Sequence, residues 1–348
     1  MPISTNQEFF VQLHLTERCN LHCSHCYQTG RGKEELSLGE IRELLEEFTD
    51  MLEAWTAAYQ LEFATSLNVT GGEPFLRPDL FAILDEMRSR GFTVYLLTNG
   101  TLIDAEGAAR LAALDVKGVQ VSIEGPEEIH DAIRGKGSFA ASRRGIGHLV
   151  AAGLPVTLNA TLSEINGDRF REMIAICTSF GAQRLGFSRL VPSGRGAHLA
   201  DRMMAPEKVR AIYEDIFSLP AEGIEIVTGD PVASQMRGGG PDGDCGPVAT
   251  GGCAAGISGL TILPDGTVVP CRRLPVPLGN VRTDSLRQIW AESAILESLR
   301  DRGRYTGRCG TCRRWAHCRG CRAIAYAASL AQGEGDLLGD DPQCFISN

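Results

Sequence analysis

The sequence has no hydrophobic run long enough to cross a membrane. A membrane-spanning helix needs roughly 20 consecutive apolar residues, and no apolar segment among the 348 residues reaches that length. The first residues also lack the basic start, apolar stretch and small-residue cleavage site of a secretory signal. We therefore expect a globular, cytoplasmic protein without a membrane partner.

The sequence also lacks an excess of positive charge. Its 34 Lys and Arg are outnumbered by 43 Asp and Glu, which gives a net charge of -9. Binding to nucleic acid depends on cations that neutralise phosphates, so no nucleic-acid partner is expected. One segment, residues 300–322, is locally basic. It is interpreted either as a solvated face or as the partner of nearby anionic clusters, and the alternative is a dock for substrate carboxylates. Its arginines are Arg300, Arg302, Arg304, Arg308, Arg313, Arg314, Arg319 and Arg322.

No G-x-G-x-x-G motif follows any predicted strand, which disfavours a dinucleotide-binding fold. From residue 9 to about residue 200, short β-type runs alternate with segments of helical period, a pattern typical of repeated βα units and a parallel sheet. This periodicity fits an open doubly wound sheet or an incomplete barrel equally well. The predicted strands are Phe9–Leu15, Leu67–Thr70, Thr93–Thr98, Gly118–Ile123, Val156–Thr161 and Arg184–Leu190. The predicted helices include Leu38–Thr49, Asp79–Arg90, Ala105–Leu114, Phe139–Ala152 and Arg169–Phe180.

A Gly, Pro and Asp-rich segment at 238–243 interrupts this pattern. It predicts two domains, residues 1–235 and residues 236–348. Eight of the 12 cysteines lie in the second domain. In a reducing cytoplasm, clustered cysteines indicate metal binding or redox chemistry rather than disulfides.

The first cysteine cluster follows the first predicted strand. Cys19, Cys23 and Cys26 form a C-x3-C-x2-C pattern. Three thiolates in one loop can hold an iron-sulfur cluster and leave one iron open for an external ligand. A zinc site completed by His22 or His25 is the alternative, although no second pair of ligands accompanies the loop.

The segment CNLHCSHCYQ resembles the signature of the radical S-adenosylmethionine superfamily. The resemblance implies an incomplete (β/α)6 barrel of the TIM type and a catalytic 4Fe-4S cluster whose open iron binds S-adenosylmethionine. Gly71, Gly72 and Glu73 begin a GGEP segment that resembles the motif holding the methionine amino group in that family.

Further cofactor contacts are implied by the same resemblance. The segment HDAIRGKGSF, which contains Arg134, is similar to one in members with cysteine-rich extensions. In those members the residues matching Ser122 and Arg134 contact the carboxylate and the ribose, and the residue matching His25 contacts adenine. Asn99, Asn159 and Leu190 are assigned to the same rim by their places at strand ends, and they complete the predicted cofactor site.

The C-terminal cysteines resemble the SPASM extension, which binds two auxiliary 4Fe-4S clusters. The run C-x2-C-x5-C-x2-C alone would also suit a four-cysteine zinc site, and its last pair is separated by two residues where three are usual. The resemblance implies one cluster on Cys309, Cys312, Cys318 and Cys344, and another on Cys253, Cys271, Cys321 and the more loosely spaced Cys245. Asp265 and Gly266 suggest a hairpin within the extension.

The function implied is that of a radical enzyme that cleaves S-adenosylmethionine, takes electrons from a donor such as flavodoxin or ferredoxin, and modifies a ribosomally made peptide by thioether formation, carbon-carbon crosslinking or oxidation. Sulfatase maturation is disfavoured because Arg272 occupies the position of the proposed catalytic Asp, and a protonated arginine is no general base. Because little chain precedes the first strand, we expect a peptide leader to be bound by a separate leader-binding protein or by the barrel itself. No catalytic side chain is predicted.

Two other functions stay open. The segment CRGCRAIAYAASLAQGEGDLLGDDPQC resembles the C-terminal part of heme and heme d1 biosynthesis enzymes, which suggests a tetrapyrrole side-chain modifying enzyme. The alternative from another class is a non-catalytic zinc or iron-sulfur electron-transfer protein.

Overall fold

The structure, a computed structural model, describes residues 7–29, 34–218, 223–236 and 249–346. Its centre is a curved ten-stranded sheet in the order β10-β9-β8-β1-β2-β3-β4-β5-β6-β7. The eight strands from β8 to β7 pair in parallel, whereas β9 and β10 are antiparallel to their neighbours. The strands are β1 (Gln7–His14), β2 (Phe63–Thr70), β3 (Thr93–Thr98), β4 (Gly118–Ser122), β5 (Val156–Leu162), β6 (Arg184–Arg189), β7 (Glu225–Val227), β8 (Gly259–Ile262), β9 (Thr267–Val269) and β10 (Gly279–Asn280).

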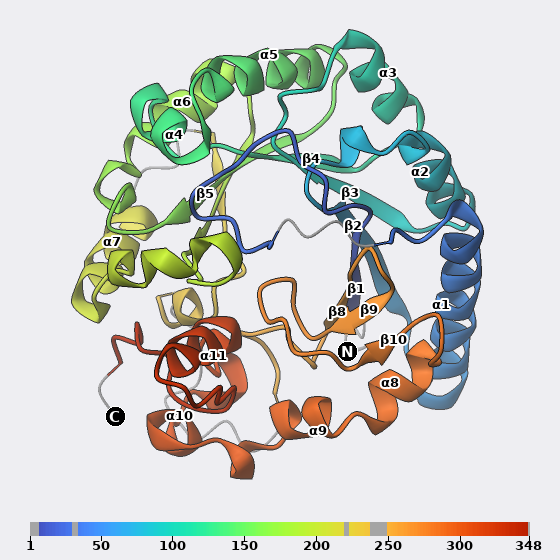
Figure 1. Cartoon of the computed structure of the whole chain (residues 1–348), viewed down its shortest axis with the longest axis vertical. Helices are drawn as coiled ribbons and strands as arrows, with labels where there is room; N and C mark the ends of the chain where they lie inside the picture. Colours follow the sequence, from blue (N-terminus) through green and yellow to red (C-terminus); the bar gives the residue numbers. More distant parts are fainter. Residues whose placement is uncertain (1–6, 30–33, 219–222, 237–248, 347–348) are drawn as a thin grey trace, which may run out of the picture.

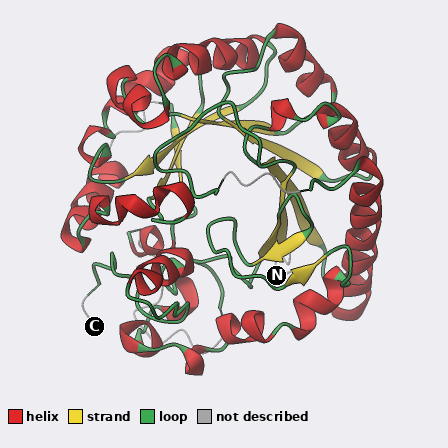
Figure 2. Cartoon of the chain, in the orientation of Figure 1, coloured by secondary structure: helices red, strands yellow, loops and turns green. Residues whose placement is uncertain are grey.

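The helices surround the sheet on its outer side (Figure 1; Figure 2). The first of them starts at a capping box, in which Ser37 and Glu40 satisfy each other's backbone N–H groups. The helices are α1 (Leu38–Tyr59), α2 (Leu80–Ser89), α3 (Ala105–Ala113), α4 (Glu127–Arg134), α5 (Ser138–Ala151), α6 (Glu172–Phe180), α7 (Pro206–Ser218), α8 (Leu286–Glu292), α9 (Ala294–Arg300), α10 (Gly307–Thr311) and α11 (Arg322–Ala331). No helix within the described ranges is long and apolar enough to cross a membrane.

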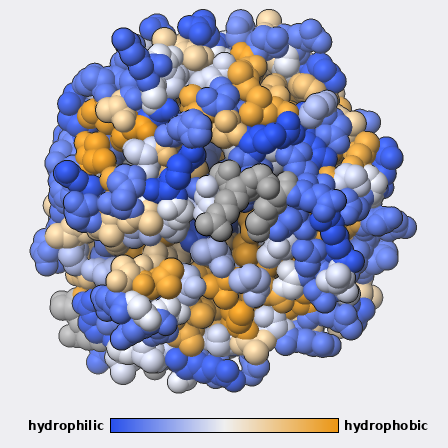
Figure 3. Space-filling view, in the orientation of Figure 1, coloured by the Kyte–Doolittle hydropathy of each residue, from blue (hydrophilic) through white to orange (hydrophobic). Residues whose placement is uncertain are grey.

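The two faces of the sheet carry different side chains. On β4, Val119 and Val121 are fully buried towards the helices, whereas Gln120 and Ser122 face a cavity inside the curved sheet. Parallel strands covered by helices on both faces are hydrophobic throughout, so polar residues on the inner face indicate a binding cavity rather than a second packed core. Hydrophilic side chains cover most of the rim of the face in Figure 3, and several hydrophobic ones lie in the hollow below its centre.

The C-terminal region spans the open side of this partial barrel. Figure 1 shows α8 to α11 lying between the α1 side and the α7 side. Strand β8 pairs in parallel with β1, so the two predicted domains share one sheet. Residues 237–248, which include the predicted linker and Cys245, lie outside the described residues, and the boundary at residue 235 stays a prediction.

The six predicted strands are confirmed as β1 to β6, and the partial barrel is confirmed over the open doubly wound sheet. The five named helices are present, with α1 ten residues longer than expected. The hairpin around Asp265 and Gly266 is formed by β8 and β9. The named elements do not include α4, α7 or β7. β7 has only three residues, whereas α7 buries Val209, Ile212, Tyr213 and Ile216 at a regular helical spacing and could have been named.

Candidate functional site

The three N-terminal cysteines lie together at the carboxyl end of β1. Cys19, Cys23 and Cys26 all line the cavity inside the partial barrel. Two side chains from other elements donate towards their sulfur atoms: Asn99 Nδ2 lies 3.9 Å from Cys19 Sγ, and Arg134 Nη1 lies 3.8 Å from Cys23 Sγ. N–H donors aimed at cysteine sulfur are typical of the surroundings of an iron-sulfur cluster. These residues therefore fit the cluster that the spacing predicts.

The geometry of these thiols differs from that of a single-ion site. Within the described ranges, no three His, Cys, Asp or Glu side chains converge closely enough to hold one metal ion. In an iron-sulfur cluster each thiolate binds a different iron, so its ligands need not converge on one point. Burial raises the pKa of Cys19 and of Cys23. Metal binding requires thiolates, so cluster assembly must release these protons.

The two glycines of the GGEP segment pack against the backbone that leads into the cysteine loop. Gly72 N–H donates to Thr16 O at 2.7 Å, and Glu73 N–H donates to Arg18 O at 2.8 Å. A Cβ atom on Gly72 would lie 2.1 Å from Arg18 O, and one on Gly71 would lie 2.5 Å from Thr16 O. Only glycine allows this approach, which fixes the chain immediately before Cys19.

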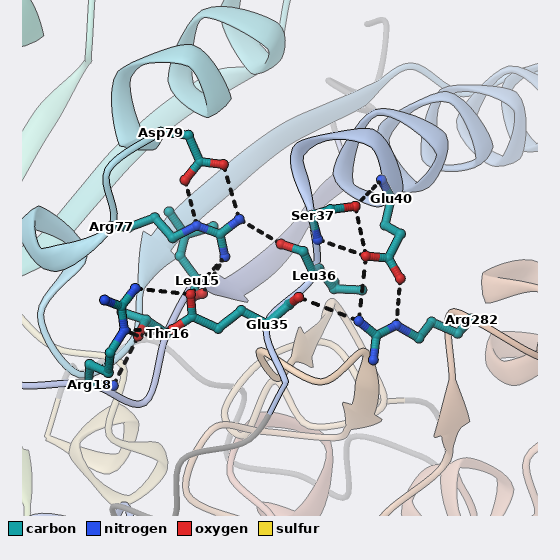
Figure 4. Close-up of polar contacts among 10 residues, drawn as sticks. All are labelled: Leu15, Thr16, Arg18, Glu35, Leu36, Ser37, Glu40, Arg77, Asp79 and Arg282. Atoms are coloured by element: carbon teal, nitrogen blue, oxygen red, sulfur yellow. Dashed lines mark hydrogen bonds and ion pairs between the residues drawn. The ribbon is translucent and has the colours of Figure 1, made fainter.

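Arg77, which follows the GGEP segment by three residues, holds this backbone from the other side (Figure 4). Its guanidinium donates to Leu15 O at 2.9 Å and to Leu36 O at 2.6 Å, and it pairs with Asp79 at 2.6 Å. Figure 4 also shows Arg282 of the C-terminal region paired with Glu40 of α1, at 2.6 Å. Arg77 is thus a positioning residue that sequence reasoning missed. The signal available was its place three residues after GGEP.

Glu73 itself is turned away from the cavity. Its buried carboxylate accepts hydrogen bonds from Thr98 Oγ1 at 2.8 and 2.9 Å and from Asn99 N–H at 2.9 Å. Burial raises its pKa, and these donors oppose that rise. Thr98 and Asn99 end β3, so Glu73 ties the GGEP turn to the neighbouring strand.

Arg134 and His25 share a buried carboxylate. Glu124 is 1% exposed. Its Oε1 accepts a hydrogen bond from Arg134 Nη2 at 2.5 Å and lies 3.1 Å from His25 Nε2, and its Oε2 accepts one from Thr161 N–H at 2.8 Å. Burial alone would raise the pKa of Glu124, but Arg134 and His25 hold it well below its usual range. This carboxylate orients two of the predicted cofactor contacts, and sequence reasoning missed its role.

The cavity collects most of the predicted cofactor residues. Besides the three cysteines, its lining includes His25, Gly71, Gly72, Asn99, Ser122, Arg134 and Asn159. Leu190 is 1% exposed and, like Glu73, lies outside the cavity lining, because its backbone continues the β6 pairing to Leu162 O; its neighbour Val191 lines the wall instead. Other lining residues were not predicted as contacts: Tyr27, Gln28, Gln120, Thr161, Ser188, Arg195, Arg272 and Arg273.

Some C-terminal thiols in the described part of the chain lie close enough to affect one another's pKa, and they form two such sets, although Cys253 N–H of one donates to Cys318 O of the other at 3.1 Å. In the first, burial raises the pKa of Cys318 to about 12 with Cys344 adding to the effect, and the raised pKa of Cys344 includes a contribution from Cys312. Cys309, whose Sγ lies 3.6 Å from Arg322 Nη2, is the fourth predicted ligand.

In the second group, burial raises the pKa of Cys321 to about 12, and Cys253 adds to the effect. Cys271 contacts the same small apolar cluster as Cys321. Cys245 lies outside the described residues. Cys177 is fully buried in α6, and its thiol donates to Ala182 O and Arg184 O at 3.5 Å, as expected of a core residue.

A buried ion network joins the barrel to the C-terminal cysteines. Arg189 at the end of β6 is fully buried and pairs with Asp230 at 2.8 Å and with Asp341 at 2.7 Å. Asp341 also accepts from Cys321 N–H at 2.8 Å. Burial is costly for a charge, but the two carboxylates keep the pKa of Arg189 well above its ordinary value.

The basic segment 300–322 is mostly structural. Arg319 and Arg322 are 2% and 1% exposed and donate to backbone carbonyls, including Gly251 O at 2.5 Å and Gly339 O at 2.7 Å. Arg300 likewise donates to Gly256 O at 2.7 Å. None of the eight arginines lines the barrel cavity. The segment is thus not a uniformly solvated face: Arg319 and Arg322 are buried, and Arg322 lies beside the predicted cluster ligand Cys309. It also does not supply the arginines of the barrel cavity.

Comparisons with known proteins agree with this architecture. Residues 13–177 match the Radical SAM superfamily, and residues 253–322 match the SPASM iron-sulfur cluster-binding domain. The chain is 34% identical to mycofactocin maturase MftC of Mycobacterium ulcerans, over 95% of this chain and 86% of the relative. It is 31% identical to the AdoMet-dependent heme synthase of Nitratidesulfovibrio vulgaris, over 95% of this chain and 90% of the relative.

A solved structure shows the same fold at much lower identity. Streptococcus suis SuiB bound to S-adenosylmethionine gives a TM-score of 0.74 at 14% identity, over 99% of this chain and 77% of that chain. The fold, the cysteine loop and the full-length relatives agree with one another. The chain belongs to the radical S-adenosylmethionine superfamily, as an enzyme with a C-terminal SPASM domain, and its cofactors are 4Fe-4S clusters and S-adenosylmethionine.

Proposed function

We propose that this enzyme modifies a ribosomally synthesised peptide, by forming a thioether or a carbon-carbon crosslink or by oxidation, at the cavity of the partial barrel. When bound, the catalytic cluster and S-adenosylmethionine supply a 5'-deoxyadenosyl radical that abstracts hydrogen from the substrate. The observation that carries the proposal is that Cys19, Cys23 and Cys26 line one cavity together with Gly71 and Arg272. That cavity combines the predicted cofactor site with a residue of the SPASM domain.

The chain's own residues have distinct roles in this proposal. The three cysteines hold the catalytic cluster. Gly71 and Gly72 fix the loop by close backbone packing. S-adenosylmethionine is contacted by Asn99 and Ser122 at the ends of β3 and β4, by Asn159 within β5, by His25 of the cysteine loop and by Arg134 of α4. Glu124 keeps Arg134 and His25 in place. Glu73 and Leu190 act from behind the wall, by holding β3 and β6.

The auxiliary clusters belong to the proposed domain 236–348, and residues 1–235 form the proposed catalytic domain. We assign Cys309, Cys312, Cys318 and Cys344 to one auxiliary cluster, and Cys253, Cys271, Cys321 and Cys245 to the other. The neighbouring thiols in each group support this division. Electrons come from an external donor such as flavodoxin or ferredoxin, and a separate protein binds the peptide's leader.

The peptide substrate is supported by the mycofactocin maturase relative, which is 34% identical to this chain over the aligned residues. SuiB, a protein of the same fold, binds the precursor peptide SuiA. A tetrapyrrole is the second candidate substrate, because the heme synthase relative is 31% identical over almost the whole chain. Arginines in the cavity suit the carboxylates of either substrate.

The chemistry is tested by anaerobic reconstitution with iron and sulfide, followed by iron counting and measurement of 5'-deoxyadenosine after addition of dithionite and S-adenosylmethionine. We expect about twelve irons per chain, as three 4Fe-4S clusters require. Cys23→Ser should abolish 5'-deoxyadenosine formation, whereas the matched variant Cys177→Ser should retain it. Bound zinc with no cleavage by the unmodified protein would refute the proposal.

The substrate is tested by adding, in separate reactions, the peptide encoded by a short reading frame beside the gene and an iron porphyrin bearing propionates. A peptide substrate predicts a mass change in the peptide and faster 5'-deoxyadenosine formation. A tetrapyrrole substrate predicts a shift in the absorbance of the porphyrin and loss of mass from one of its side chains. A mass change in the porphyrin alone would replace the first candidate by the second.

A further inference from the structure

Three arginines line the cavity outside the predicted cofactor contacts. Arg195 follows β6, and Arg272 and Arg273 follow Cys271 in the SPASM domain. Among the described residues, none of the three forms an ion pair with a carboxylate, in contrast to Arg134, which is paired with Glu124. A cation held in a partly buried cavity is unfavourable unless an anion accompanies it. The cavity therefore has more positive charge than its own residues neutralise.

Two of these arginines have other partners. Arg273 donates to Arg189 O at 3.1 Å and is close enough to Cys321 and Cys271 for their thiolates to raise its pKa. Arg195 Nη1 lies 2.6 Å from His22 Nδ1, and its charge opposes the rise that burial causes in the pKa of Cys23. Each therefore faces a predicted cluster, whose negative charge can accompany it.

Arg272 is different. Within the described part of the chain its guanidinium has no hydrogen bond, and its one recorded contact is the ring of Tyr27, 5.9 Å from the guanidinium carbon, a distance at which a cation is attracted to an aromatic face. Its histidine neighbour gives no compensation: burial, with a contribution from Arg272, lowers the pKa of His14 to about 3, so His14 is neutral. The donors of Arg272 are free to bind a ligand in the cavity.

We infer that Arg272 binds a carboxylate of the substrate and so selects acidic substrates for the barrel cavity. A guanidinium presents parallel N–H donors that match the two oxygens of a carboxylate. Tyr27 packs against the guanidinium and limits its orientation. This inference rests on the proposed function, because it requires that the substrate occupies the cavity.

The ligand chemistry is a carboxylate, and it has two possible sources. In a peptide it is the C-terminal carboxylate or an acidic side chain, and in a tetrapyrrole it is a propionate. In either case the anchor lies on the segment that follows Cys271, so a bound carboxylate is also next to a predicted auxiliary-cluster ligand. This position would fix the substrate between the catalytic loop and the SPASM domain.

The test compares reconstituted wild-type enzyme with Arg272→Gln and with the control Arg287→Gln, which changes an exposed arginine of α8. Two pairs of probes are used: a pool of synthetic pentapeptides as free acids or as C-terminal amides, and coproporphyrin or its tetramethyl ester. The peptides that stay bound to the enzyme are identified by mass spectrometry, and porphyrin binding is measured by absorbance. Iron content and circular dichroism verify that each variant is folded and loaded.

We expect one acid to bind and its amide or ester to bind far more weakly. Losing a charge-assisted hydrogen bond should weaken binding of the acid by Arg272→Gln about ten- to hundredfold, whereas Arg287→Gln should match the wild type. Binding of the peptide acid identifies a peptide source, and binding of coproporphyrin identifies a tetrapyrrole source.

Equal binding by Arg272→Gln and wild type, equal binding of acid and neutral probes, or no binding of either acid would overturn the inference. The proposed function is judged separately by 5'-deoxyadenosine formation in the wild-type enzyme. An active enzyme in which Arg272→Gln binds normally would refute the carboxylate anchor alone.

Discussion

The close packing of Gly72 makes a quantitative prediction about how the cysteine loop is held. In Gly72→Ala, the added Cβ would lie 2.1 Å from Arg18 O and 2.6 Å from Arg18 C. Both are backbone atoms, and they cannot move aside as the end of a flexible side chain could. The segment from Thr16 to Arg18 would have to shift, and with it the start of the loop that carries Cys19.

The cost follows from the contacts that the shift disturbs. Overpacking of a well-packed site typically costs about 1–3 kcal/mol. The hydrogen bonds from Gly72 N–H to Thr16 O and from Glu73 N–H to Arg18 O would also lengthen, and each contributes about 1 kcal/mol. We therefore expect Gly72→Ala to lower the free energy of unfolding by about 2–4 kcal/mol. Displacement of Cys19 should also reduce bound iron by about four atoms, the content of one cluster.

The assay is anaerobic urea unfolding combined with iron analysis, and Gly147→Ala is the matched control. Gly147 lies within α5, where an added Cβ would meet nothing within 4 Å. This control should leave the iron content unchanged and stabilise the protein by up to about 1 kcal/mol, because alanine favours a helix. If Gly72→Ala unfolds at the same urea concentration as Gly147→Ala and binds as much iron as the wild type, the packing argument is wrong.

Three further predictions concern buried ionisable side chains. Glu124→Gln should lower the free energy of unfolding by about 3–5 kcal/mol, because it leaves a buried arginine without its carboxylate, whereas the exposed control Glu225→Gln should change it by less than about 1 kcal/mol in the same urea assay. Arg189→Met should cost a similar 3–5 kcal/mol or so, because two buried carboxylates lose their shared cation. Burial lowers the pKa of His14 to about 3 from 6.5, so the unfolded chain binds the extra proton between these pH values, and stability should fall with decreasing pH by up to about 1.4 kcal/mol per pH unit. His14→Asn should remove that slope, and the exposed control His198→Asn should retain it, in urea unfolding at pH 5 and pH 7.

Each of these predictions has an outcome that would contradict it. A Glu124→Gln variant as stable as Glu225→Gln would mean that the buried carboxylate is not what compensates its arginine. An unchanged midpoint for Arg189→Met would show that its two carboxylates take up protons at little cost. If His14→Asn and the wild type have the same pH slope, the slope has another origin than this histidine.

The cysteine loop and the six central strands could be predicted from the sequence, because their signals are local. Cys19, Cys23 and Cys26 occur within eight residues, and each strand is a short apolar run with its own turn signals. The GGEP segment could be located for the same reason. The physical role of this segment was harder to predict. Its glycines are needed because two backbones meet there, and the backbone that Gly72 meets, at Arg18, is set by the pairing of β1 with β2.

Residues that act over long sequence separations could not be predicted. Glu124 compensates Arg134 at a separation of 10, but it also accepts from Thr161, 37 residues away, and that bond depends on the pairing of β4 with β5. Arg189 and Asp341 are 152 residues apart. A pattern in the sequence indicates which residues are charged, but the sheet order decides which charges meet.

The SPASM domain completes the active cavity rather than adding a separate module beside it. Its strand β8 pairs with β1, the strand that delivers the cysteine loop, and the segment after β9 carries Arg272 into the cavity. Arg189 fixes the other side, because Asp341, which it pairs with, also receives the backbone N–H of Cys321. The cysteine loop and β6 therefore extend from one sheet, and the buried ion network ties β6 to the predicted auxiliary ligand Cys321. It follows that residues 1–235 alone would lack the strand beside β1, the arginine at the cavity wall and the Asp341 partner of Arg189, and that a change at this buried network should affect β6 and the segment of Cys321 together.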